Sequence, residues 1–142
     1  MDQPIALIFF FAAILIFGGI LFAIIAFTKR GIRSLDVEKY RCRWMEIEGQ
    51  LVKDDPKTYS LCILNADSLL DKALREKNIP GKTMGERMKQ LQGKWTNGNG
   101  VWAAHKLRNR IAHEPEGLNL DYDRTRQALG SFKQALKDVG AI

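Results

Sequence analysis

The chain has 142 residues, of which 22 are basic and 16 are acidic, and its formal net charge is +6 at pH 7. This length leaves room for one domain of ordinary size and one additional element. All 22 basic residues and 15 of the acidic residues lie beyond residue 28, so that part alone carries a net charge of +7.

The first long segment of the chain is an uncharged apolar run. Residues 5–27 are 23 residues without a charge. A helix of this length measures about 35 Å and can cross a hydrocarbon core of about 30 Å with some tilt. A cleaved signal peptide is the alternative, but residues 1–4 contain no Lys or Arg and the run is much longer than a signal core. We therefore predict a transmembrane helix at residues 5–27.

A basic segment follows the apolar run. By the positive-inside rule, it places the C-terminal part of the chain in the cytoplasm and residues 1–4 outside, as expected for a single-pass protein of the inner cell membrane. We interpret these side chains as contacts for anionic lipid headgroups, worth about 1 kcal/mol each near the surface, in preference to nucleic-acid contacts. They are Lys29, Arg30, Arg33, Lys39, Arg41 and Arg43. Residues 28–35 are predicted to be a hinge before a domain at residues 36–142.

The apolar residues of that domain recur at steps of three and four, which predicts an all-α bundle without strands. Ser34 or Asp36 could cap its first helix, and Asp121 or Asp123 its last. The Gly- and Asn-rich segment 94–100 is predicted to be an irregular loop. Four long helices and one short helix are expected, at residues 37–53, 56–77, 83–93 (the short one), 102–113 and 122–139.

Residues 104–115 place both histidines, two arginines and an asparagine on one predicted helix. At 100° per residue, His105, Asn109 and His113 form a polar stripe that is separate from the apolar stripe of the same helix. Pro115 disfavours helical geometry for the preceding residue and should end the helix near His113. From that position the imidazole can turn back toward Arg108.

At these residues the sequence resembles a known family. Arg108-Asn109, three residues and then His113 is similar to the Arg-x(4–6)-His motif of the HEPN superfamily, whose domains are all-helical. The preceding helix with residues 69–74 and the short helix opening at Thr83 follow the order seen in small bacterial HEPN-like domains. The resemblance covers about residues 36–142. It implies a bundle of four to five helices that forms a homodimer, and the small-residue face at Gly19 and Ala23 is compatible with paired membrane helices.

Catalytic members of this family cleave RNA without a metal, usually at a cleft between two protomers. The resemblance would place Arg108, Asn109 and His113 in such a site, while His105 lies outside the motif. Arg108 would stabilise charge on the phosphoryl oxygens, and His113 could transfer a proton. Many HEPN-like domains instead serve as binding or dimerisation modules, and a fold does not carry a function with it.

The motif also has a structural interpretation. Arg108 could pair with Glu114 or Asp121, Asn109 could bind a backbone group, and His113 could cap the last carbonyls of its helix. His105, beside Trp102, is interpreted as a partly buried structural residue. We therefore predict a membrane-anchored interaction module with an unknown protein partner, and as the alternative a membrane-tethered endoribonuclease.

The cysteines give no sign of a metal site. Cys42 and Cys62 should stay reduced in a cytoplasmic domain, and their spacing matches no zinc motif. Pooling them with the two histidines produces no pair with the spacing of metal ligands. We predict neither a metal nor a cofactor.

Overall fold

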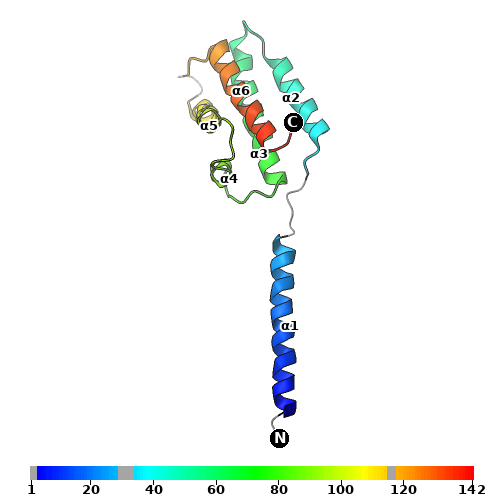
Figure 1. The fold of residues 1–142 in the computed structure, drawn as a ribbon. Coiled ribbons are helices and arrows are strands. Elements are labelled where there is room, and N and C mark those ends of the chain that lie inside the picture. Colours follow the sequence, from blue (N-terminus) through cyan, green and yellow to red (C-terminus); the bar gives the residue numbers. More distant parts are fainter. Residues whose placement is uncertain (1–2, 29–33, 115–117) are drawn as a thin grey trace. The chain divides into compact units, whose positions relative to one another are not determined.

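The computed structural model describes residues 3–28, 34–114 and 118–142. Within these ranges the chain contains six helices and no strand, which confirms the predicted all-α class (Figure 1). The chain divides into two compact units between residues 33 and 34. The helices are α1 (Gln3–Thr28), α2 (Val37–Gln50), α3 (Pro56–Glu76), α4 (Met84–Gln90), α5 (Gly98–His113) and α6 (Tyr122–Asp138).

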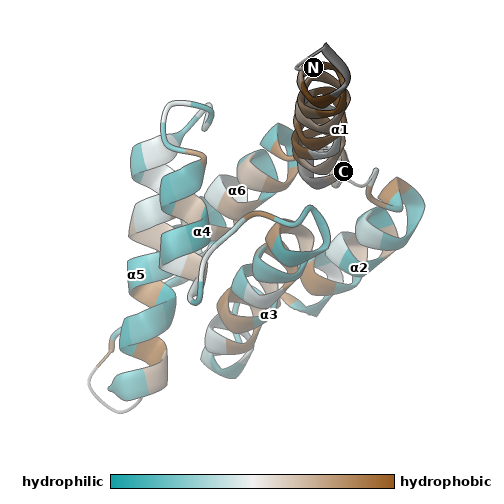
Figure 2. Ribbon diagram, turned by 90° about the horizontal axis from the view of Figure 1, so that it is seen from below, coloured by the Kyte–Doolittle hydropathy of each residue, from teal (hydrophilic) through white to brown (hydrophobic). Residues whose placement is uncertain are grey.

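The first unit contains α1, which is mostly hydrophobic (brown in Figure 2), with polar residues only at its two ends, Gln3 and Thr28. Its 22-residue segment Ile5–Ala26 is long and apolar enough to cross a membrane, and none of that segment is buried within the chain. A helix that is apolar on every side is typical of a buried or membrane-spanning environment. The predicted tail (residues 1–4) and hinge (residues 28–35) lie partly outside the described residues. Lys29, Arg30 and Arg33 lie wholly outside them.

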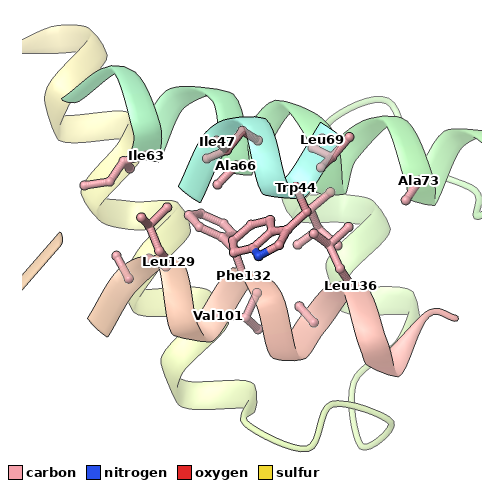
Figure 3. Close-up of a cluster of buried hydrophobic side chains, with 14 of the residues drawn as sticks. Trp44, Ile47, Ile63, Ala66, Leu69, Ala73, Val101, Leu129, Phe132 and Leu136 are labelled. Carbon is pink, nitrogen blue, oxygen red and sulfur yellow. The ribbon is translucent and has the colours of Figure 1, made fainter. Parts of the chain in front are cut away.

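The second unit, Ser34–Ile142, is organised around α3, which contacts the other four helices of the unit, while α5 also contacts α6. Figure 3 shows apolar side chains of α2, α3, α5 and α6 meeting in one core. Full burial of a Leu or Phe side chain contributes about 1.5–3 kcal/mol, so this core is the main stabilising element. Its labelled residues are Trp44, Ile47, Ile63, Ala66, Leu69, Ala73, Val101, Leu129, Phe132 and Leu136.

Side chains just before the helices determine where several of them begin. Asp36 accepts a hydrogen bond from the Lys39 backbone N–H, and Asp121 accepts one from the Arg124 backbone N–H, so these two aspartates are the caps. Each satisfies a first-turn donor that has no partner within the helix. α2 ends three residues before the predicted Lys53, because Leu51 adopts an extended backbone.

The start of α5 corrects the sequence prediction. Residues 94–100 were predicted to be an irregular loop, but the helix already begins at Gly98. The Asn97 side chain accepts a hydrogen bond from the Gly100 backbone N–H at 3.0 Å, and a Cβ at Gly100 would lie only 2.2 Å from Asn97 Nδ2. Gly100 therefore leaves space for the cap, and burial of Val101 fixes the first turn against the core.

Candidate functional site

A polar pocket of about 560 Å³ lies among α3, the beginning of α4 and α5. The four predicted residues His105, Arg108, Asn109 and His113 all line it. The predicted polar stripe of α5 therefore faces one pocket, while the apolar stripe of the same helix is buried in the core. From α3 the pocket receives the carboxylates of Asp67 and Asp71, and also Ser68 and Arg75.

His105 is buried, with only 9% of its surface exposed, and both of its ring nitrogens have partners. Its Nδ1 lies 2.7 Å from Asp67 Oδ1, and its Nε2 lies 3.4 Å from Asn109 Nδ2. An ionised carboxylate only accepts hydrogen bonds, so Nδ1 carries the proton, and Nε2 accepts from the amide of Asn109. The interpretation of His105 as a structural residue agrees with this geometry.

Arg108 and Asn109 complete a ring of contacts with Asp67 and His105. The Asn109 Oδ1 atom accepts a hydrogen bond from Arg108 Nη1 at 3.1 Å, and Arg108 Nε lies 3.2 Å from Asp67 Oδ2. The Nε–H does not point at that oxygen, so the contact is an ion pair, and the buried Nε has no hydrogen-bond partner within the described residues. We call Asp67, His105, Arg108 and Asn109 the α3–α5 ring.

The partners proposed from the sequence for Arg108 are not the ones that the structure shows. Arg108 pairs with Asp67, 41 positions earlier in the chain, rather than with Glu114 or Asp121. Within the described residues, Asn109 bonds two side chains of its own helix, and the following loop, where a backbone partner was proposed, lies partly outside those residues. Local proximity made the nearer acids plausible, whereas the packing of α5 on α3 decides the pairing.

His113 differs from the residues of the ring because it is exposed. It is the last residue of α5 and lines the pocket with Arg108, and within the described residues its imidazole makes no hydrogen bond. The backbone N–H of Glu114, rather than the imidazole, bonds the Arg110 carbonyl at 2.7 Å. Pro115, predicted to end this helix, lies outside the described residues.

A second buried carboxylate lies one helical turn beyond Asp67. Asp71 Oδ1 accepts hydrogen bonds from Arg87 Nε at 3.0 Å and from Arg87 Nη2 at 2.6 Å, and its other oxygen accepts one from Arg75. The remaining guanidinium nitrogen of Arg87 bonds the Gly81 carbonyl at 2.6 Å. Gly81 has a φ of 152°, and a Cβ there would lie 2.8 Å from the Arg87 backbone nitrogen, so the loop needs glycine at this position.

Reasoning from the sequence missed Asp67, Asp71 and Arg87. A detectable signal was present, because the two aspartates are four residues apart and interrupt the apolar stripe of α3. Aspartate is almost never fully buried unless it is paired, so two aspartates on a buried face indicate two basic partners elsewhere in the chain. The identity of those partners depends on which helices contact α3.

The pocket offers hydrogen-bond donors more readily than metal ligands. Arginines offset the negative charge of both carboxylates. The groups that remain facing the pocket are the outer part of the Arg108 guanidinium, the Asn109 amide and the His113 imidazole. Among the residues described, no three His, Cys, Asp or Glu side chains are grouped to hold a metal ion. Cys42 is exposed and Cys62 is buried, and burial raises the pKa of the Cys62 thiol.

No protein-family model matches this chain, and comparison with curated proteins and with solved structures gives no match. The HEPN resemblance therefore rests on the motif residues and the order of the helices. The geometry adds that the motif residues share one pocket, and that Arg108 and Asn109 are engaged with α3 and with each other.

Proposed function

We propose that this chain is a single-pass membrane protein whose second unit is a cytoplasmic interaction and dimerisation module of HEPN type. The uniform apolar surface of α1 supports the anchor, because water solvates such a surface poorly and a bilayer solvates it well. The basic residues after it support the orientation.

The α3–α5 ring is the observation that favours a module over an enzyme. A catalytic arginine must be available to charge that develops on the substrate. Arg108 instead pairs through Nε with the buried Asp67 and donates from Nη1 to Asn109, so much of its guanidinium is already engaged within the ring. The ring fixes α5 on α3 and gives the pocket a defined polar surface, which we propose as the surface that a second copy or a protein partner contacts.

The structural role of the ring can be measured on the full chain in a nonionic detergent. Urea unfolding is followed by the fluorescence of the three tryptophans, which all lie beyond residue 33. The free energy of unfolding should fall by about 1–3 kcal/mol in Arg108→Ala, because this change removes a partner of buried polar groups. The matched control is Arg110→Ala, an exposed arginine on the same helix, which should lose less than about 0.5 kcal/mol. Equal losses in the two variants would refute the structural role.

Dimerisation is tested on the same samples by sedimentation in density-matched detergent. If the α5 pocket meets a second copy, Arg108→Ala and His113→Ala should weaken the dimer, while Arg110→Ala should not. A wild-type chain that remains monomeric at high concentration would remove homodimerisation from the proposal and leave a different protein as the partner.

The membrane topology can be tested through the cysteines. Cys42 is exposed and Cys62 is buried, so a maleimide reports on one position of the folded chain. A membrane-impermeant maleimide added to intact cells should leave Cys42 unlabelled and should label it once the cells are permeabilised. In a variant with Asp2→Cys, the tail should be labelled without permeabilisation. Labelling of Cys42 in intact cells would reverse the proposed orientation.

The alternative function is a metal-independent endoribonuclease, and one observation favours it. His113 is exposed and lines the same pocket as Arg108, whose side chain is 37% exposed. In this proposal the RNA 2′-hydroxyl attacks the adjacent phosphorus and the P–O5′ bond breaks, which leaves a 2′,3′-cyclic phosphate on one strand and a 5′-hydroxyl on the other. His113 takes the proton of the 2′-hydroxyl or supplies the proton to the departing 5′-oxygen, and Arg108 stabilises the phosphoryl charge.

Incubation of the detergent-solubilised full chain with mixed RNA in EDTA distinguishes the two functions. The nuclease proposal requires cleavage by the wild type and its loss in His113→Ala, without loss of stability, because His113 is exposed. Absence of cleavage by a folded wild type would leave the interaction module. If Arg108→Ala and His113→Ala both kept full stability and no RNA were cut, neither account of the motif would stand.

A further inference from the structure

A second hollow, of about 240 Å³, lies between α2 and α3, on residues outside the polar pocket apart from Ser68. Three cationic side chains line it: Lys39 and Arg43 from successive turns of α2, and Lys72 from α3. The buried residues Ile47 and Leu69 also line it and give it an apolar floor. We call this hollow the α2–α3 groove.

Among the described residues, the positive charges of the groove outnumber its negative charges. Its single carboxylate, Glu46, forms an ion pair with Arg43 at 2.6 Å. Lys39 and Lys72 form no ion pair within the described residues. Like charges four residues apart on a helix, such as Lys39 and Arg43, destabilise it by a few tenths of a kcal/mol, and Lys72 adds a third cation from the facing helix. An anion held among the three side chains would remove this repulsion.

The groove also carries neutral hydrogen-bonding groups. The exposed residue Ser68 lines it, as do Gln50 and Asn65, whose amides are joined by a hydrogen bond of 3.3 Å. Phosphate oxygens accept hydrogen bonds from ammonium, guanidinium and hydroxyl groups alike. The volume lies just below the range of about 300–1,000 Å³ that is typical of sites for drug-sized ligands, so a headgroup fits and a whole lipid does not.

We propose that the α2–α3 groove binds the phosphate of an anionic lipid headgroup. The lipid source rests on the proposed membrane anchor: Lys39 follows Thr28, the last residue of α1, by 11 positions, which an extended chain can bridge over at most about 40 Å. The site is distinct from diffuse attraction of the basic segment. Lys72 belongs to the groove although it lies far beyond that segment, and Arg41 belongs to the segment but does not line the groove.

The full chain in a nonionic detergent allows the groove to be tested against diffuse attraction. Monomeric dihexanoyl phosphatidylglycerol is titrated, and thermal unfolding is followed by tryptophan fluorescence, because a ligand that binds the folded state raises the unfolding temperature. The binding constant should weaken about tenfold or more in Arg43→Gln and Lys72→Gln. Arg41→Gln and Lys89→Gln, matched exposed substitutions outside the groove, should stay within about twofold of the wild type.

Four results would overturn the proposal. Equal weakening in Arg41→Gln and Arg43→Gln would show diffuse attraction. Inorganic phosphate binding as tightly as the lipid, or dihexanoyl phosphatidylcholine stabilising the chain equally, would show that the groove does not select an anionic headgroup. No saturable effect would show that no site exists. Since Cys42 labelling reports the membrane topology separately, failure of the groove and failure of the anchor are distinguishable.

Discussion

Asp67 and Asp71 occupy successive turns of one face of α3, and both are almost fully buried. Asp71 is bonded by Arg87, whose side chain is itself only 9% exposed and which also bonds the Gly81 carbonyl. Asp67 is bonded by His105 and paired with Arg108, whose side chain is 37% exposed. Asp71 is thus held by an enclosed arginine, with the largely exposed Arg75 as its second partner. Asp67 is held by an enclosed histidine, with the more exposed Arg108 as its second partner. The two aspartates therefore differ in the residue type of the enclosed partner.

The largest expected effect is at the enclosed pair. Arg87→Ala leaves Asp71 with only the exposed Arg75 and frees the Gly81 carbonyl, so the free energy of unfolding should fall by about 3–5 kcal/mol. Arg75→Ala removes a largely exposed partner of the same carboxylate and should cost about 0–1 kcal/mol. Urea unfolding measures both losses. If Arg87→Ala lowered the free energy of unfolding less than Arg75→Ala does, Arg87 would not be the main partner of Asp71.

The second effect concerns the coupling between Asp67 and Arg108. A double-mutant cycle with Asp67→Asn and Arg108→Ala should give a coupling energy of about 0.5–3 kcal/mol, because the two groups are in contact. The corresponding cycle of Asp67→Asn with Arg110→Ala should give a coupling near zero, since Arg110 is exposed and no contact joins the two residues. Identical couplings in the two cycles would contradict the ring.

Asp138 extends the comparison to a carboxylate near the surface. Partial burial by itself raises the pKa of Asp138, but hydrogen bonds from Thr96 and Gln134 outweigh it and hold the pKa below its usual value of 3.8. A lowered pKa contributes stability that is fully present above about pH 3.8 and is lost as the pH falls through the native pKa.

Asp138→Asn should therefore lower the free energy of unfolding by about 0.5–1 kcal/mol at pH 7. The difference in this free energy between the variant and the wild type should shrink below about pH 3.8. Unfolding by urea at several pH values measures this difference. Lys137→Gln, an exposed neighbouring substitution, serves as the control and should not reproduce the dependence on pH. A difference that grows toward acid pH would contradict the direction of the shift.

The smallest effect on stability is expected for His113→Ala. The imidazole is exposed and makes no hydrogen bond within the described residues, so the change should stay within about 0.5 kcal/mol. His105→Ala, which removes a buried ring with two partners, is the contrasting variant and should cost several times more. Comparable losses would show that His113 is held by contacts beyond the described residues.

The α5 motif shows which features of the candidate site could be predicted from the sequence and which could not. The periodicity of residues 104–113 correctly separated the polar stripe from the buried stripe, because both follow from 3.6 residues per turn. The partners of the stripe were not predicted, since Asp67 reaches His105 across 38 positions of the chain. The beginning of α5 was placed four residues late, because glycines that usually signal a loop here make space for the Asn97 cap.

By itself, the sequence determined the helical class, an apolar helix long enough to span a membrane, two candidate caps for each of α2 and α6, and the face of α5 that carries the polar residues. These features depend on neighbours within a few positions, where periodicity and hydrogen bonding to the backbone are sufficient. Only the tertiary structure decided that Asp67 binds His105 and Arg108, that Arg87 encloses Asp71, and that Lys72 joins Lys39 and Arg43 in one groove. Those pairings require knowing which helices pack together, because a buried charge finds its partner by proximity in space and not in sequence.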